Sequence, residues 1–131
     1  RRYMQPWCVN SLAQEAVCVL GSNRMSVDAF ITRTRAFLAE EGALFRRRLH
    51  CDRLRVYPST TSYFLIGLPE NRTATEVCHT LGTQRLLIRN CANFHGLDEG
   101  YIRIALKDAA TNRAVAGHLL IAVGANQEVT P

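Results

Sequence analysis

The apolar residues between Ser26 and His50 recur at intervals of three and four, which is the spacing of one face of an α-helix. This pattern predicts a long amphipathic helix over residues 26–50 that buries one stripe of side chains. The stripe comprises Val27, Phe30, Ile31, Thr34, Phe37, Leu38, Leu44, Phe45 and Leu49.

A shorter helix is predicted upstream. Residues 11–20 are good helix formers, Asn10 or Ser11 precedes them as a possible N-cap, and Gly21 follows as a stop signal. A short helix is therefore expected within residues 1–21.

Four segments have the pattern of β-strands. Residues 54–57 alternate until Pro58, whereas residues 63–66 form the continuous apolar run of a central strand beside them. Residues 86–89 resume the strand pattern, and residues 101–106 alternate cleanly. One side of this last strand carries Ile102, Ile104 and Leu106.

Two further helices alternate with these strands. Thr73 and Glu76 form a capping box, which opens a helix that ends near Gly82. Asp108 is the predicted N-cap of a final helix. The residues expected to be buried there are Val115, Leu119 and either Leu120 or Ile121.

The order of elements predicts an α+β fold. Short links between strands favour a mostly antiparallel small sheet of about four strands, with helices packed on one face. We expect a single domain over 1–131, in which the long helix of 26–50 precedes an αβ core over 54–124.

Composition narrows the setting of this fold. The chain has 131 residues, of which 47% are hydrophobic, and this is enough for one sizeable core. No apolar run approaches the length of about 18 residues that a membrane-spanning helix needs. The five cysteines are an odd number without the spacing of a disulfide framework, so we expect reduced thiols and a cytoplasmic location.

The chain is basic, with a formal net charge of +5, and Lys107 is its only lysine. The densest basic cluster, Arg46–Arg48, lies at the end of the long predicted helix, where it offsets the helix dipole and is solvated. This placement favours a solvated helix end over a nucleic-acid surface.

Arg89 and Arg103 form the most informative pair. If the strands that carry them are antiparallel neighbours, both guanidinium groups lie on the side opposite the apolar residues. Like charges repel unless an anion joins them, and a guanidinium matches a carboxylate or phosphate. Asp98 and Glu99 could instead neutralise the pair as surface salt bridges.

The sequence around this pair resembles a known family. The segment 87–105 reads LIRNCANFHGLDEGYIRIA, residues 6–14 read PWCVNSLAQ, and Val56–Ser59 leads to 63–65. These segments resemble the C-terminal small domain of fold-type I pyridoxal-phosphate enzymes, the class I/II aminotransferases. Within them, the form of the Cys91–Asp98 motif is most similar to the threonine-phosphate decarboxylases of cobalamin biosynthesis, with histidinol-phosphate aminotransferases as the alternative. The resemblance implies that residues 1–21 are the segment, with its short helix, that links the two domains of such an enzyme.

The resemblance implies roles for three residues. Arg103 would bind the α-carboxylate of the substrate, Arg89 would help to hold its anionic end, and Asn93 would belong to the same substrate-binding set. Pyridoxal 5'-phosphate would be bound mainly by a large domain outside this chain, which would carry the catalytic lysine. Lys107 is not in the position of that lysine and is expected to be exposed at a helix start.

The same resemblance implies a cytoplasmic homodimer acting on a phosphorylated amino acid, with no nucleic acid, membrane or metal partner. The isolated chain, which would hold no catalytic and no cofactor-binding residue, is expected to be inactive.

Other interpretations use different residues. A zinc site could combine Cys78, His79, Cys91 and His95, but the chain has no Cys-x-x-Cys pair. Cys91, beside Arg89, could have a lowered pKa, although no partner base is evident. A non-catalytic α+β module could capture an anionic ligand or nucleic acid on the arginine face.

Overall fold

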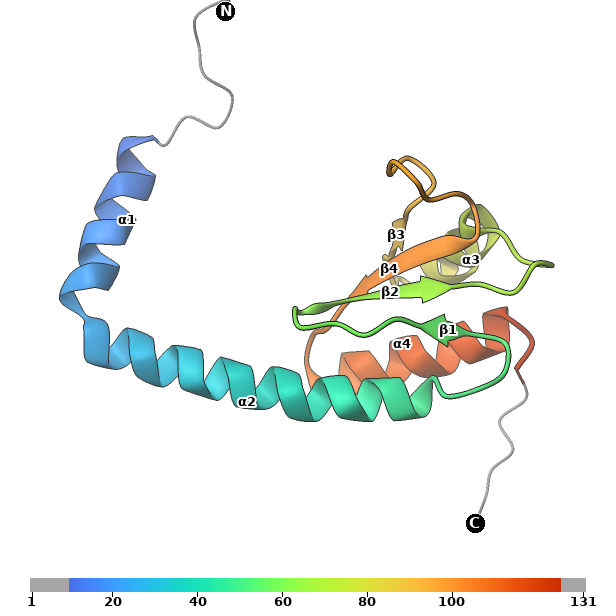
Figure 1. The fold of residues 1–131 in the computed structure, drawn as a ribbon, viewed down its shortest axis with the longest axis horizontal. Coiled ribbons are helices and arrows are strands. Elements are labelled where there is room, and N and C mark those ends of the chain that lie inside the picture. The colour runs from blue at the N-terminus through green and yellow to red at the C-terminus, as the bar shows by residue number, and fades with distance from the viewer. Residues whose placement is uncertain (1–9, 126–131) are drawn as a thin grey trace, which may run out of the picture. The chain divides into compact units, whose positions relative to one another are not determined.

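The computed structural model describes residues 10–125, and the elements in this range follow each other in the predicted order (Figure 1). Residues 1–9, which include part of the 6–14 match, and residues 126–131 lie outside the described residues. The helices are α1 (Ser11–Ser22), α2 (Arg24–Arg48), α3 (Ala74–Thr83) and α4 (Ala109–Ala122). The strands are β1 (Arg55–Val56), β2 (Tyr63–Gly67), β3 (Arg89–Asn90) and β4 (Tyr101–Ala105).

The strands form one four-stranded antiparallel sheet in the order β1-β2-β4-β3. This arrangement confirms the predicted α+β class and the central position of the 63–66 strand. In the register of the two long strands, Leu65 is opposite Arg103 and Ile66 is opposite Ile102. Because side chains alternate along each strand, the register fixes which residues share a face.

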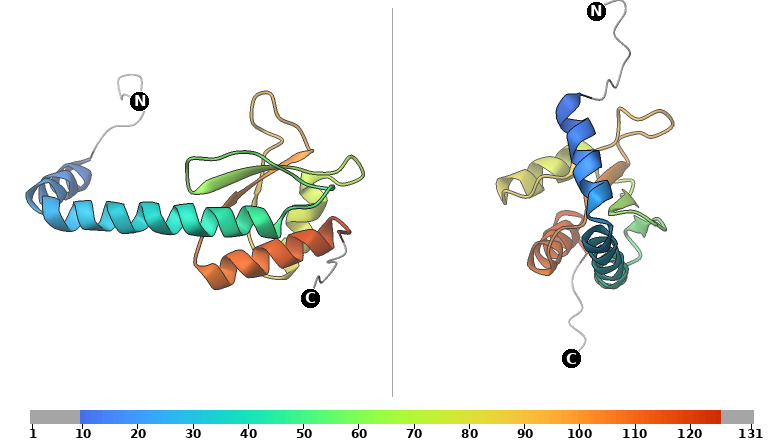
Figure 2. Two further views of the ribbon diagram at one scale, coloured as in Figure 1. Left: turned by 60° about the horizontal axis from the view of Figure 1, so that its bottom comes forward. Right: turned by 90° about the vertical axis from the view of Figure 1, so that its left-hand side faces the viewer.

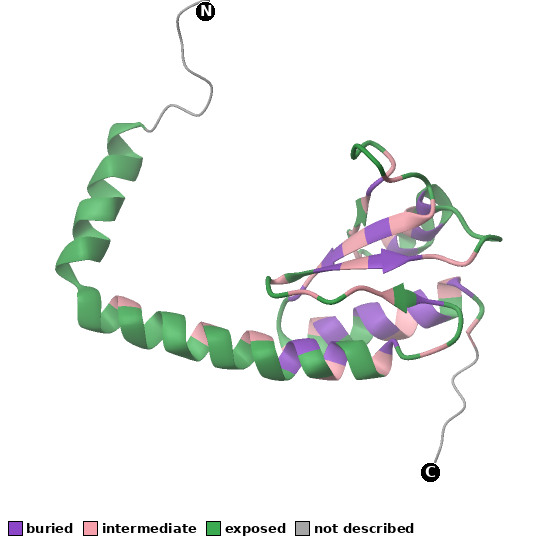
Figure 3. Ribbon diagram, viewed as in Figure 1, coloured by how far each residue is buried: buried purple, intermediate pink, exposed green. Residues whose placement is uncertain are grey.

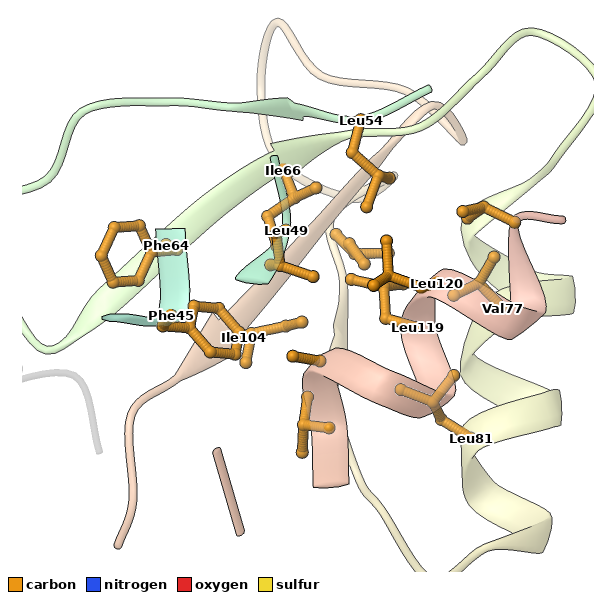
Figure 4. Packing of buried hydrophobic residues seen from close by; sticks show 14 of the residues in the cluster. Phe45, Leu49, Leu54, Phe64, Ile66, Val77, Leu81, Ile104, Leu119 and Leu120 are labelled. Carbon is orange, nitrogen blue, oxygen red and sulfur yellow. The ribbon is translucent and has the colours of Figure 1, made fainter. Parts of the chain in front are cut away.

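The core lies on one face of this sheet. Phe64, Ile66 and Ile104 are buried there against side chains from α2, α3 and α4 (Figures 3 and 4). Figure 2 shows the C-terminal part of α2 running beside α4. The prediction that helices cover one face is confirmed. The helical side chains include Phe45, Leu49, Val77, Leu81, Leu119 and Leu120.

The chain divides into two compact units, Arg1–Ala36 and Phe37–Pro131, and the whole sheet belongs to the second. A single domain over 1–131 stays a prediction. In the part of the chain that the structure describes, no helix is both long and apolar enough to cross a membrane.

Helix caps agree with the sequence at three starts. The Asn10 carboxamide oxygen accepts the Ala13 amide at 2.9 Å, the Thr73–Glu76 capping box is complete, and Asp108 caps α4. The predicted stop at Gly21 is wrong, because α1 continues to Ser22. A helical glycine costs only about 1 kcal/mol, so it does not by itself end a helix.

The buried stripe predicted for the long helix is only half correct. Phe45 is fully buried, but Phe30 is 61% exposed and Phe37 is 41% exposed. The helix also begins at Arg24 rather than Ser26 and ends at Arg48 rather than His50. Periodicity identifies the apolar face of a helix but not what covers it, and within residues 10–125 nothing covers the first half of this one.

Candidate anion-binding site

Arg89 and Arg103 are directly opposite each other across the β3–β4 pair. Arg103 occupies the centre of β4, where its neighbours Ile102 and Ile104 are buried on the helical side. Both guanidinium groups therefore emerge on the uncovered face, as strand parity predicted. Arg103 is half-buried, whereas Arg89 is exposed near the edge of the sheet.

Two aromatic rings lie beside the two guanidinium groups. The guanidinium carbon (Cζ) of Arg89 lies 5.4 Å from the ring centroid of Phe94, and the Cζ of Arg103 lies 5.7 Å from the same centroid. Arg103 also lies 4.6 Å from the ring centroid of Tyr63, which comes from β2. Both rings are within cation–π range of an arginine. The sequence prediction missed these two aromatic residues.

Asn93 belongs to the same cluster. Its carboxamide oxygen accepts a hydrogen bond from Nη2 of Arg89 at 3.0 Å. The loop that carries Asn93 is held at its start, where the Asn90 oxygen accepts the Ala92 amide at 2.8 Å and the Cys91 carbonyl accepts the Phe94 amide at 2.9 Å. The structure thus brings together all three residues that the resemblance named for the substrate.

The acids of the loop are engaged elsewhere. Asp98 accepts the backbone amide of Gly100 at 2.8 Å. Glu99 accepts the backbone amide of Thr75 at 3.0 Å and the side chain of Asn90 at 3.3 Å. The Thr75 amide is the main reason why the pKa of Glu99 lies below its ordinary value, followed by the Asn90 and Thr75 side chains.

Neither arginine has an acidic partner in the described part of the chain. Over the range 10–125, no ion pair joins Arg89 or Arg103 to a carboxylate. The alternative in which Asp98 and Glu99 neutralise the pair is wrong, because those carboxylates bind amide and hydroxyl donors instead.

Cys91 is buried behind this face, and its thiol donates weakly to the Arg89 carbonyl at 3.8 Å. Burial raises the pKa of this thiol and outweighs the lowering effect of Arg103 and Arg89. A thiol whose pKa is raised is mostly protonated at neutral pH and is a poor nucleophile. The lowered pKa considered for Cys91 is therefore wrong.

The remaining candidates lie outside this cluster. Lys107 is exposed immediately before the Asp108 cap of α4, as predicted. Among the residues described, no three His, Cys, Asp or Glu side chains are grouped so that they could hold a metal ion.

A hollow of about 980 Å³ lies next to β1, away from the arginine pair, and is lined by residues that include Arg55, Tyr57 and Tyr101. None of Arg89, Asn93 and Arg103 lines it. Acidic side chains are mixed with its arginines, including Asp52, Glu70 and Asp98, so it does not have the unbalanced positive charge of the arginine pair. The guanidinium pair is the stronger candidate for binding an anion.

Comparisons with known proteins point to one family. The family model described as aminotransferase class I and II matches residues 1–120. The chain is 38% identical over 120 residues to the threonine-phosphate decarboxylase of Salmonella typhimurium, covering 91% of this chain and 31% of that protein.

Two solved structures share the fold. The histidinol-phosphate aminotransferase of Clostridium acetobutylicum matches with a TM-score of 0.75 at 23% identity, over 94% of this chain and 36% of that one. The L-threonine-O-3-phosphate decarboxylase of Porphyromonas gingivalis matches with a TM-score of 0.69 at 30% identity, over 92% and 36% respectively. The chain therefore spans about a third of the length of these relatives.

Proposed function

We propose that this chain, which belongs to the aminotransferase class I and II family of pyridoxal-phosphate enzymes, binds the anionic groups of an amino acid substrate through Arg103 and Arg89. The observation that carries the proposal is the pair of opposed guanidinium groups on the uncovered face. Two positive charges that lack an acidic partner among residues 10–125 attract an anion, and each guanidinium can donate two parallel hydrogen bonds to a carboxylate or phosphate.

The surroundings of the two arginines suggest different roles. Arg103 is half-buried and contacts two rings, so its position is the better defined, and it suits the α-carboxylate. Arg89 is exposed and bonded to Asn93, which suits the distal anion of the substrate. Asn93 contributes by holding the Arg89 guanidinium in place.

The proposed substrate is a phosphorylated amino acid. Identity to a threonine-phosphate decarboxylase extends over 120 residues, which favours decarboxylation of L-threonine-O-3-phosphate in cobalamin biosynthesis. The second candidate is a histidinol-phosphate or related aminotransferase, because a histidinol-phosphate aminotransferase is 36% identical to this chain over 53 residues. Membership in a family of enzymes favours either of these over a non-catalytic module.

Bound pyridoxal phosphate supplies an electron sink, and the protein decides which bond at the substrate's α-carbon is broken by orienting it. The role of this chain would be to orient the substrate. A carboxylate held by Arg103 fixes the rotation about the bond between the α-carbon and its nitrogen. Lys107 is the only lysine in the sequence and is exposed at the start of α4. We therefore propose that the lysine that carries the cofactor belongs to a separate large domain. From membership in the family we also propose that the enzyme is a cytoplasmic homodimer.

The test uses the full-length gene product with L-threonine-O-3-phosphate, and it measures release of CO₂ and, in parallel, amino transfer from histidinol phosphate. Removing the guanidinium with Arg103→Ala should lower kcat/KM by at least about 30-fold, because a bound anion loses its charged hydrogen-bond partner. Arg113→Ala is the matched control, since Arg113 is an exposed arginine on α4. Unchanged turnover in Arg103→Ala would refute the carboxylate role.

A further inference from the structure

We propose that Phe94 is a positioning residue, whose ring keeps the Arg89 and Arg103 guanidinium groups side by side and free to bind substrate anions. This inference rests on the proposed function, since it explains how the binding pair is maintained before substrate arrives. It concerns a residue that touches the arginines rather than the reacting atoms.

The pair needs such a residue because its two charges oppose each other. Arg89 and Arg103 are cross-strand partners, and like charges directly opposite in a sheet are destabilising. Elsewhere a carboxylate would offset this repulsion, but no carboxylate in the described part of the chain is paired with either arginine. Something other than an acid must hold them.

The ring of Phe94 provides a neutral substitute. Its centroid lies 5.4 Å from the guanidinium carbon of Arg89 and 5.7 Å from that of Arg103, so one ring attracts both cations. A neutral ring differs from an acid in one important respect. It does not neutralise the guanidinium charge, and it does not use the in-plane N–H donors that a carboxylate or phosphate needs.

The backbone fixes the ring at this point. The Phe94 amide donates to the Cys91 carbonyl at 2.9 Å, and the Phe94 carbonyl accepts the Leu97 amide at 3.1 Å. The neighbouring residue Asn93 accepts a hydrogen bond from Arg89 at 3.0 Å. Adjacent loop residues therefore contact the same guanidinium, one by its ring and one by its oxygen.

The ring has no role in the core. Phe94 is 38% exposed and does not belong to the cluster of buried residues. Tyr63, which contacts Arg103 from β2, is similarly 44% exposed. Both exposed rings lie within cation–π range of an arginine, which gives each of them a contact outside the core.

The test compares Phe94→Leu with Phe94→Tyr in the full-length gene product. Leucine keeps an apolar side chain but removes the π system, whereas tyrosine keeps the ring. We expect KM for the phosphorylated amino acid, and the inhibition constant of inorganic phosphate, to rise about fivefold in Phe94→Leu with kcat nearly unchanged, and both to stay within about twofold in Phe94→Tyr. Leu87→Ala is the control, because Leu87 is 93% exposed near Arg89 and should change neither constant.

The outcomes separate this inference from the proposed function. If Arg103→Ala weakens substrate binding but Phe94→Leu does not, the positioning role is refuted while the proposed function stands. If Arg103→Ala also has no effect, the proposed function fails and the inference fails with it. Equal losses in Phe94→Leu and Phe94→Tyr would also refute the inference, because the ring would not be the cause.

A second variant covers the case in which Phe94→Leu does not fold. Phe94→Met also removes the ring, and its flexible side chain suits a residue that is 38% exposed. A higher KM in Phe94→Met than in Phe94→Tyr supports the positioning role of the Phe94 ring, and equal values refute it.

Discussion

At the scale of single residues, one buried carboxylate is held by a side-chain amide. Glu41 of α2 is 6% exposed, and its Oε2 accepts a hydrogen bond from Nδ2 of Asn112 at 3.0 Å. Asn112 also accepts the Lys107 amide at 2.7 Å and donates to the Lys107 carbonyl at 3.0 Å. Arg48 approaches the same carboxylate oxygen at 3.9 Å. Asn112, which lies in α4, therefore joins this helix to α2 and to the segment between β4 and α4.

Replacing this amide should destabilise the fold. Asn112→Ala leaves the buried Glu41 carboxylate without its hydrogen-bond donor and the part-buried Lys107 backbone groups without their side-chain partner, so we expect a loss of about 2–3 kcal/mol in the free energy of unfolding. Urea denaturation of the full-length gene product measures it, with Arg113→Ala, at the neighbouring exposed position, as the control. A loss below about 0.5 kcal/mol would show that water replaces the amide without cost.

The positions of Arg89 and Arg103 could be predicted because strand alternation is a local rule. Once Ile102 and Ile104 are assigned to the core, Arg103 must point the other way. The contact with Tyr63 could not be predicted, because it depends on the register of β2 against β4, which sets Leu65 opposite Arg103. The position of Phe94 likewise depends on the backbone hydrogen bonds of the loop between β3 and β4, which the spacing of residues does not predict.

At the scale of elements, the cap of α3 couples the fold to pH. The Thr73 amide donates to Glu76 Oε2 at 3.0 Å, and the Glu76 amide donates to the Thr73 hydroxyl at 3.2 Å. The Thr73 backbone amide is the main cause that lowers the pKa of Glu76 below its ordinary value of 4.5, with the Thr73 hydroxyl second. The carboxylate form is therefore the one that stabilises the helix start.

The direction of the pH effect follows from this lowered pKa. The contribution of Glu76 is fully present above 4.5 and is lost as the pH falls through the lower pKa of the folded state. Wild type should unfold at a higher urea concentration than Glu76→Gln at neutral pH, and the two midpoints should converge in acid. A midpoint difference that persists unchanged in acid would mean that the charge of Glu76 is not involved. Glu99 and Asp108, whose pKa values are also lowered, are common to both proteins and cancel in the comparison.

The order and type of the elements could be predicted, but the lengths of the edge strands could not. β3 comprises only Arg89–Asn90, because Leu86 still donates its amide to the Leu81 carbonyl at the end of α3. β1 comprises only Arg55–Val56, since the Leu54 amide forms a turn with the Cys51 carbonyl. Both amides bind carbonyl groups outside the sheet, and an alternating apolar pattern does not predict such bonds.

At the scale of the whole molecule, the chain has apolar surface that its own described residues do not cover. α1 has no buried residue, and Leu12 and Leu20 are 82% and 55% exposed. Phe30, in the first half of α2, is 61% exposed. The sequence predicted both helices but not what covers their apolar side chains. Because the chain matches about a third of its relatives' length, we expect other parts of the gene product to cover this surface.

Hydrogen exchange in the full-length gene product tests this expectation. α1 has 12 residues and no buried side chain, and an isolated helix of about this length is marginal in water, so without a covering partner its amides should exchange almost freely. If its apolar side chains are covered, its amides should instead exchange slowly, at rates nearer to those of α4, where Leu119 is fully buried. Leu20→Glu should then accelerate exchange throughout α1, because a charge would enter the covered surface, whereas Glu15→Gln on the same helix should not. Fast exchange in wild-type α1 would show that the surface stays open, and the exposed apolar residues would then need another explanation.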